Sequence, residues 1–228
     1  MHIAMKKICI IQTGMSSSSS ELTALCAEIM PEVGVSQIID DSILKEILAA
    51  GRISPALGRR MYSYCQQAQA SGADAILYPC VAATGIVEQI QAFLDIPIIR
   101  IDEGMARQAA CSAGKVAVFA TAPLALEQSM KLLRLRSREA GRELTLSAFL
   151  IETPRQTVRE TAEKAAAEHD LILLAQPSMG VLLPLLSGLS KPVLHCTRSG
   201  VEYLRSCLLQ EDFLCPGANG CSRSLDGR

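Results

Sequence analysis

The fold is indicated most clearly by the stretch ADAILYPC, residues 73–80, and by its counterpart DLILLAQ, residues 170–176. Each stretch has an aspartate near its start, continues as a short apolar run and precedes a helical pattern, as expected of a buried parallel strand. Open α/β sheets bind their ligands beyond the carboxyl ends of such strands. Cys80 and Gln176, where the two runs end, are therefore candidates for a ligand site.

Apolar runs rich in β-forming residues alternate with helical patterns through most of the chain. Such alternation indicates a parallel α/β protein. A closed eight-stranded barrel typically needs about 250 residues, so two smaller open sheets fit these 228 residues better. The predicted strands are Lys7–Gln12, Val35–Ile39, Ala73–Tyr78, Ile96–Ile101, Lys115–Thr121, Thr145–Ile151, Asp170–Ala175 and Pro192–His195.

A loose internal repeat suggests how these strands are divided. The run KICII, residues 7–11, opens the first half, and KVAVF, residues 115–119, opens the second, each before a turn that contains threonine. Cys80 and Gln176 then lie at comparable depth in the two halves. We therefore expect a duplicated fold with a cleft between its halves. The predicted first half is residues 1–96 plus about 197–228, and the second is residues 97–196.

Composition limits the classes of partner. The chain is 49% hydrophobic and 20% charged with a formal net charge of −1, and it has no long run of lysine or arginine. This balance argues against nucleic acid and against an anionic membrane surface as partners. No apolar stretch of about 18 residues and no signal-length segment is present, so we expect a cytoplasmic protein. The nine cysteines are odd in number and lack zinc-ligand spacing, which favours free thiols without a metal.

Several side chains at predicted strand ends could carry chemistry. The thiol of Cys80 precedes a turn into a helix, where amides and the helix dipole are expected to lower its pKa, although free cysteines often serve as small buried hydrophobes. The serine run 16–20 could hold an anion or form a flexible loop. Thr121 offers a hydroxyl. His195 closes the last strand and could transfer protons, or be a structural histidine. Asp102 and Glu103 could orient a catalytic group or cap a helix.

These residues resemble the aspartate/glutamate racemase superfamily, which includes glutamate, aspartate and hydantoin racemases, maleate isomerase and arylmalonate decarboxylase. The resemblance covers about Lys7 to Leu204. It rests on Cys80 with its following turn and on four segments: IPIIRIDEGM at 96–105, GKVAVFAT at 114–121, LAQPSM at 174–179 and KPVL at 191–194. It implies two pseudosymmetric Rossmann-like α/β halves, no cofactor, and a small carboxylate substrate in the cleft between them.

The resemblance also implies roles for individual positions. In the two-base racemases a cysteine from each half faces the stereocentre of the substrate, and Cys80 matches the cysteine of the first half. Gln176 stands where the second cysteine is expected, and an amide neither accepts nor releases a proton at a useful pKa. Val81 and Ala82 stand where polar residues often follow the first cysteine.

Three functions remain open from the sequence. The first is an isomerase, of the racemase or epimerase class, in which Cys80 is the base, Gln176 faces it, and His195 supplies any second proton transfer. The second is a lyase such as a decarboxylase, which needs only one proton donor. The third is a non-catalytic binder of small carboxylates, and a homo-oligomer is left open in each case. The residues expected to hold the carboxylate are Thr13, Ser16, Val81, Ala82, Thr121 and Ser178.

Overall fold

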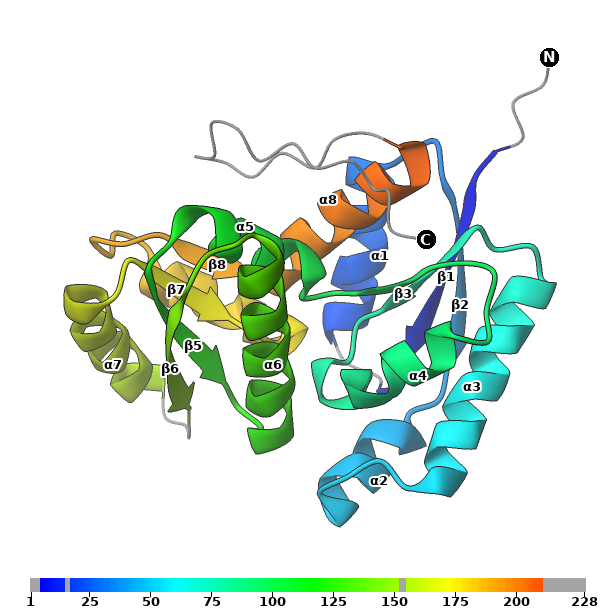
Figure 1. Ribbon diagram of the computed structural model, residues 1–228, viewed down its shortest axis with the longest axis horizontal. Coiled ribbons are helices and arrows are strands. Elements are labelled where there is room, and N and C mark those ends of the chain that lie inside the picture. Colours follow the sequence, from blue (N-terminus) through cyan, green and yellow to red (C-terminus); the bar gives the residue numbers. More distant parts are fainter. Residues whose placement is uncertain (1–4, 15–16, 152–154, 211–228) are drawn as a thin grey trace.

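The computed structural model describes residues 5–14, 17–151 and 155–210. It contains two α/β halves that lie side by side (Figure 1). The first half has a four-stranded parallel sheet in the order β2-β1-β3-β4. Its strands are β1 (Lys7–Gln12), β2 (Gly34–Ile39), β3 (Ala75–Tyr78) and β4 (Ile98–Arg100).

The second half repeats this topology. Its parallel sheet has the order β6-β5-β7-β8, so the first strand of each half lies between the second and the third. The two halves and their parallel sheets confirm the predicted fold. The first sheet includes β4, which pairs with β3. The strands of the second sheet are β5 (Lys115–Ala120), β6 (Thr145–Leu150), β7 (Leu171–Leu174) and β8 (Val193–His195).

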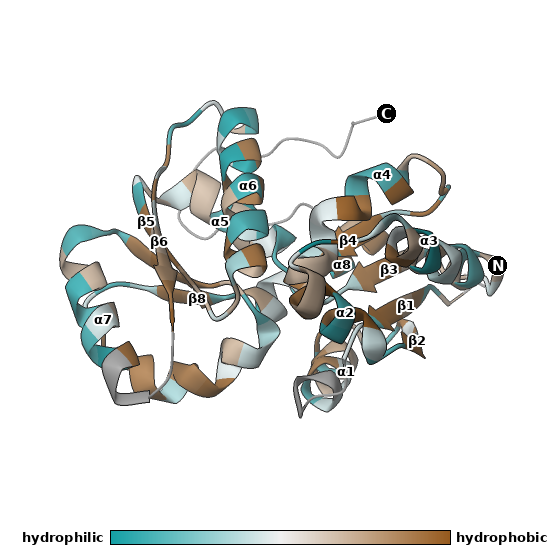
Figure 2. Cartoon of the chain, turned by 90° about the horizontal axis from the view of Figure 1, so that it is seen from below, coloured by the Kyte–Doolittle hydropathy of each residue, from teal (hydrophilic) through white to brown (hydrophobic). Residues whose placement is uncertain are grey.

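Helices follow nearly every strand and surround both sheets. Hydrophobic residues concentrate in the strands, whereas outer helices such as α3 and α6 carry much of the hydrophilic surface (Figure 2). Within the described ranges, no helix combines the length and the apolar character that a membrane crossing requires. The helices are α1 (Ser17–Ile29), α2 (Ser42–Ala50), α3 (Pro55–Ala70), α4 (Val87–Gln91), α5 (Glu103–Ser112), α6 (Pro123–Glu139), α7 (Arg155–Glu168) and α8 (Cys196–Leu209), with 3-10 helices η1 (Val81–Ile86) and η2 (Pro177–Leu186).

The aspartates that precede β3 and β7 have matching structural roles. Asp74 Oδ2 accepts a hydrogen bond of 2.8 Å from the backbone amide of Lys7, at the start of β1. Asp170 Oδ2 accepts a hydrogen bond of 2.8 Å from the backbone amide of Lys115, at the start of β5. In each half, therefore, an aspartate joins the entrance of the third strand to that of the first. The repeat read from the sequence is present in the hydrogen bonds.

Two helices, α5 and α8, connect the halves and cross each other at a pair of glycines. A Cβ atom added to Gly104 would lie 2.0 Å from the carbonyl oxygen of Ser199, and one added to Gly200 would lie 2.1 Å from that of Ile101. Real Cβ atoms do not approach backbone oxygens so closely. The crossing therefore requires glycine on both helices.

The halves also meet through the 3-10 helices that follow their third strands. η1 of the first half packs against α6 of the second, and η2 of the second half packs against α1 of the first. α1 and α6 are equivalent elements, because each follows the first strand of its half. Cys80 immediately precedes η1 and Gln176 immediately precedes η2, so each of these residues adjoins a segment that packs against the other half.

Candidate active site

Cys80 lies at the carboxyl end of β3, beside the end of β1. Thr13, the residue after β1, is buried, and its side chain hydrogen-bonds the Cys80 thiol. The backbone amide of Ala83, in the first turn of η1, donates a hydrogen bond of 3.0 Å to the Cys80 carbonyl oxygen, and the amides of Ala82 and Ala83 also act on the sulfur by lowering its pKa. The thiol itself is half-buried. The thiol thus lies among groups that favour its ionised form, in a residue that is partly exposed.

Gln176 occupies the matching place in the second half. Its Oε1 atom accepts hydrogen bonds from the backbone amide of Thr121, at 2.6 Å, and from the Thr121 hydroxyl, at 3.1 Å. Thr121 follows β5 as Thr13 follows β1, so the two threonines are equivalent. The side-chain NH2 group of Gln176 makes no hydrogen bond within the described part of the chain. With its oxygen occupied, this side chain is left as a hydrogen-bond donor.

The pKa of the Cys80 thiol is raised above its ordinary value, opposite to our expectation. Burial is the dominant cause, because it disfavours the charged thiolate. The hydrogen bonds from Thr13, Ala83 and Ala82 lower the pKa, as expected for the start of a helix, but do not offset burial. The thiols of Cys26 and Cys65 are also buried and have pKa values of about 12.

His195 lies at the end of β8 against the backbone of Gln176. Its Nε2 atom is 3.0 Å from the Gln176 carbonyl oxygen and is positioned to donate a hydrogen bond to it. Burial lowers the pKa of His195, although its contacts with the Gln176 and Pro177 backbone act in the opposite direction. The ring is therefore neutral near pH 7. In this arrangement His195 holds the main chain that presents the Gln176 side chain.

The other expected binding residues differ in how far they are exposed to solvent. Val81 and Ala82 are buried, so their side chains belong to the core and only their backbone can face a ligand. Ser178 is exposed in the first turn of η2. Ser16, like the tail beyond residue 210, lies outside the described residues.

Asp102 and Glu103 serve the junction between the halves. Asp102 is fully buried. Its carboxylate accepts two hydrogen bonds from the Arg100 guanidinium and a third, of 3.0 Å, from the Ser129 hydroxyl. Glu103 pairs with Arg107 and with Arg136 of α6. Both carboxylates therefore form ion pairs. That of Glu103 with Arg136 links α5 to α6.

The sequence reading did not single out a polar group at the end of β2. Asp40 accepts a hydrogen bond of 2.8 Å from the Tyr64 hydroxyl and lies 3.2 Å from Arg60 Nε. Burial alone would raise the pKa of Asp40, but hydrogen bonds from Ser42 and Tyr64 and the charge of Arg60 lower it overall. Asp40 directly follows a predicted strand. The criterion that selected Cys80 would therefore have selected Asp40 as well.

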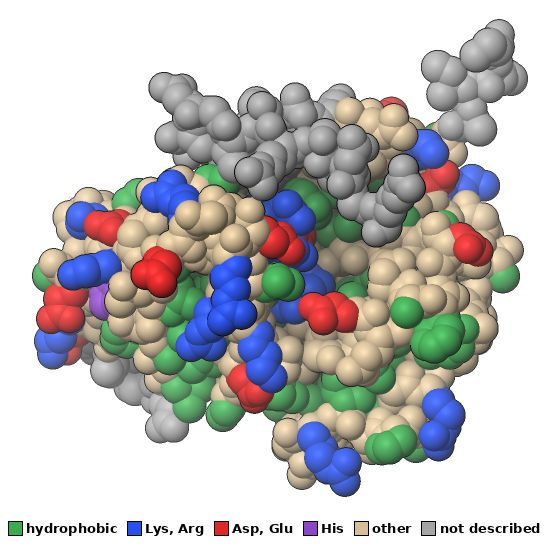
Figure 3. Space-filling model, in the orientation of Figure 1, with side chains coloured by type: hydrophobic (Ala, Val, Ile, Leu, Met, Phe, Trp, Pro, Cys, Tyr) green, Lys and Arg blue, Asp and Glu red, His purple; other side chains and the backbone are tan. Residues whose placement is uncertain are grey.

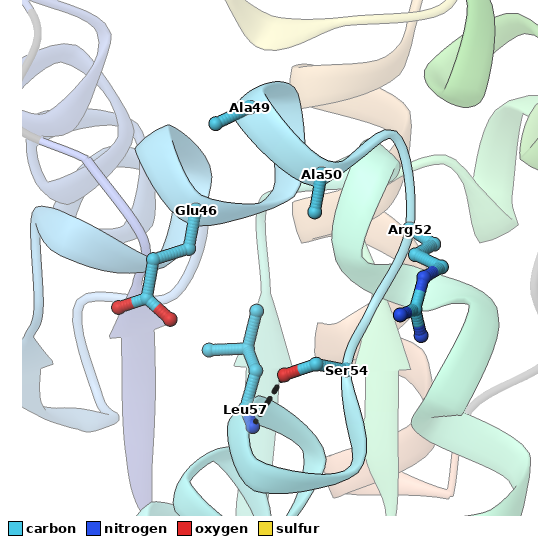
Figure 4. A pocket seen from close by; sticks show the side chains of 6 residues that line it. All are labelled: Glu46, Ala49, Ala50, Arg52, Ser54 and Leu57. Atoms are coloured by element: carbon cyan, nitrogen blue, oxygen red, sulfur yellow. Dashed lines mark hydrogen bonds between the residues drawn. The ribbon is translucent and has the colours of Figure 1, made fainter.

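Two hollows on the described part of the chain are lined by other residues than the candidates. The larger, about 350 Å³, lies beside α2 and the start of α3 (Figure 4). There Ser54 Oγ caps α3 by accepting a hydrogen bond of 3.1 Å from the Leu57 amide, as its position before Pro55 predicts. Among the residues described, no group of three histidine, cysteine or acidic side chains could hold a metal ion. The smaller hollow lies at the junction between the halves.

The Thr13–Cys80 contact gives a testable pH dependence. Because the thiolate is the reactive form, alkylation of Cys80 by iodoacetamide should accelerate as the pH rises toward its elevated pKa. Thr13→Val removes a donor to the thiolate, and such a bond contributes about 1.5–3 kcal/mol, so alkylation at fixed neutral pH should slow by about tenfold or more. Peptide mapping after timed labelling measures both rates. Equal rates in the two proteins would contradict the contact.

Comparison with known proteins agrees with this architecture. Residues 13–204 match the Asp/Glu/hydantoin racemase family. No curated protein matches the sequence. Among solved structures, allantoin racemase from Klebsiella pneumoniae is similar at 19% identity and a TM-score of 0.66, covering 98% of this chain and 97% of that one.

Two further structures have the same fold. A putative Asp/Glu racemase from Yersinia pestis has a TM-score of 0.69 at 14% identity, covering 90% of this chain and 100% of that one. Glutamate racemase RacE1 from Bacillus anthracis has a TM-score of 0.65 at 15% identity, covering 92% of this chain and 84% of that one. At these identities the likeness concerns the fold, whereas the family match spans most of the sequence. The chain belongs to the Asp/Glu/hydantoin racemase family.

Proposed function

We propose that this chain is a cofactor-independent isomerase of the racemase type that acts on a small carboxylate with Cys80 as its base. Membership of the racemase family supports the reaction class. The observation that carries the residue assignment is the matched pair of contacts, Thr13 with Cys80 and Thr121 with Gln176, at equivalent strand ends of the two halves. One half thus offers a proton-transferring group and the other an oriented amide.

The proposed reaction begins with the Cys80 thiolate. It removes the proton from the carbon next to the substrate carboxylate, and the electron pair of the broken C–H bond moves toward the carboxylate oxygens. The NH2 group of Gln176 donates a hydrogen bond to an oxygen that gains negative charge, which stabilises the intermediate. The Cys80 thiol then returns a proton to the carbon and becomes a thiolate again.

The expected stereochemistry depends on which groups can transfer a proton to each face of the α-carbon. Because Cys80 approaches from one face and Gln176 cannot transfer a proton, the simplest cycle exchanges the α-hydrogen without inverting the carbon. Inversion requires a second donor on the opposite face. We assign that role to His195, although burial lowers its pKa and so reduces the fraction of the protonated, proton-donating ring near pH 7. Its Nε2 contact with the Gln176 carbonyl makes inversion slower than exchange, because the ring must leave this contact or use its other nitrogen.

A decarboxylase is the second candidate, and the presence of Gln176 favours it. When a substituted malonate loses carbon dioxide, the electron pair of the broken C–C bond remains on the α-carbon as an enolate. A single proton from the Cys80 thiol completes that reaction. The same arrangement of one thiol and one amide therefore suits a lyase.

Proton exchange tests the proposal without assuming a product. The full-length protein is incubated in deuterium oxide with amino acids, hydantoins and substituted malonates, and the α-hydrogen is followed by NMR. Loss of the α-hydrogen signal is the expected result. Release of carbon dioxide would assign the chain to the lyases instead. A ligand-induced rise in melting temperature without exchange or release would overturn both reactions and leave a binding role.

A further inference from the structure

The smaller hollow, of about 270 Å³, lies in the seam between the two halves, and its lining includes none of the candidate active-site residues. Figure 3 shows a depression between the halves with basic side chains gathered beside it. The first half contributes residues of η1, α4 and β4, and the second contributes one face of α6. The lining residues are Gly85, Glu88, Arg100, Gln128, Lys131, Leu132 and Leu135.

Arg100 presents one unused edge of its guanidinium to this hollow. The residue is only 8% exposed. Its Nε and Nη2 atoms donate to Asp102 at 3.0 and 2.9 Å, and Nη2 also approaches the backbone oxygen of Gln128. Within the described ranges, Nη1 has no hydrogen-bond partner. Asp102 thus fixes the orientation of the guanidinium while leaving donors for a carboxylate.

Gln128 is a second polar group held in the seam without a partner. It is 8% exposed, yet neither atom of its side-chain amide forms a hydrogen bond with any residue that the structure describes. A Cβ atom added to Gly85 would lie 3.1 Å from its Nε2 atom, so the absence of a side chain at Gly85 lets this amide pack closely against η1. The nitrogen and oxygen of this amide are not fully enclosed by protein, so they are open to hydrogen bonding in the hollow. A ligand in the hollow would satisfy them.

The charges of the hollow have both signs. Lys131 is cationic but pairs with Glu127 of the same helix at 2.6 Å, and Arg100 pairs with Asp102. Glu88 has no ion pair within the described part of the chain. A simple anion would therefore meet an uncompensated carboxylate. A molecule with one anionic and one cationic end meets complementary groups at both ends.

We propose that this seam is a binding site for a free α-amino acid, distinct from the catalytic cleft. The carboxylate of the ligand receives hydrogen bonds from Arg100 Nη1 and the Gln128 amide, and its ammonium group faces Glu88. Leu132 and Leu135 contact its side chain, which favours an aliphatic one. Since the ligand touches both halves, its binding stabilises their association.

Isothermal titration of the full-length protein with each common L-amino acid tests the proposal. At least one aliphatic amino acid should bind, whereas its N-acetyl derivative, which lacks the ammonium group, and its amide, which lacks the carboxylate, should not. Glu88→Gln should weaken binding by about 10-fold to 100-fold, because it removes a charged partner. Gln128→Leu should weaken it by about 2-fold to 10-fold. Glu160→Gln, at an exposed position on α7, is the matched control and should bind normally.

The Cys80→Ser variant separates this site from the cleft and should retain full affinity for the same amino acid. Affinity that is lost in Cys80→Ser but unchanged in Glu88→Gln and Gln128→Leu would place the ligand in the cleft and overturn the proposal. The absence of a binding isotherm with every amino acid would overturn it as well. Neither result depends on whether the chain catalyses proton transfer.

Discussion

Gly200→Ala should lower the free energy of unfolding by about 3 kcal/mol or more, the upper range for overpacking a core. The new methyl group would lie 2.1 Å from the carbonyl oxygen of Ile101 and 2.8 Å from its carbonyl carbon. These are backbone atoms, so no side-chain rotation can relieve the contact, and α5 and α8 would have to separate. Urea unfolding followed by circular dichroism measures the loss.

Gly58→Ala is the matched control, because it also places alanine at a buried position of a helix. Its Cβ atom would meet only the terminal methyl group of Ile86, which can rotate away. Alanine also favours helix by about 1 kcal/mol over glycine, so the net change should be small. An unfolding midpoint for Gly200→Ala no lower than that of Gly58→Ala would contradict the close crossing of α5 and α8.

Cys80→Ser should slow α-hydrogen exchange by about 10²-fold to 10⁴-fold, the usual contribution of a positioned general base. The serine hydroxyl can accept the same hydrogen bonds from Thr13 and the η1 amides, but it does not form an anion near neutral pH. NMR in deuterium oxide measures the rate for any substrate that the wild-type protein exchanges. The fold should be unchanged, because serine is smaller than cysteine and Cys80 is only half-buried.

Cys111→Ser provides a control for the loss of a half-buried thiol elsewhere in the chain. It should exchange the α-hydrogen at the wild-type rate. Full exchange in Cys80→Ser would exclude this thiol as the base and would move attention to the polar group around Asp40, which also lies at a strand end of the first half.

Much of the fold could be predicted because its signals are local. The apolar runs before Cys80 and Gln176 are short, uniformly buried strands, and runs of this kind are typical of parallel sheets. The predicted strand ends differ from the structure by at most a few residues. Position after a strand also selected Thr13, Cys80, Thr121 and Gln176 as candidates, since neighbouring parallel strands end at the same edge of a sheet, but the sequence did not predict that each threonine contacts the residue after the neighbouring strand.

The remaining features depend on contacts between distant parts of the chain. The sign of the Cys80 pKa shift follows from how much protein covers the thiol, which the residues around it in sequence do not reveal. The amino-acid site brings Gly85 of η1 beside Gln128 of α6, and neither residue belongs to a motif. The glycines of the α5–α8 crossing likewise become interpretable only when Gly104 and Gly200 are seen against the opposite backbone.

The central claim is that one proton-transferring thiol faces an amide, and the ratio of α-hydrogen exchange to inversion tests it most directly. The wild-type protein and Gln176→Cys are compared in deuterium oxide, with exchange followed by NMR and inversion by chiral chromatography of the same samples. The account predicts that the wild type exchanges its substrate faster than it inverts it, and that Gln176→Cys, with a thiol in each half, brings inversion close to the rate of exchange. Inversion that already keeps pace with exchange in the wild type, and is unchanged by Gln176→Cys, would contradict it.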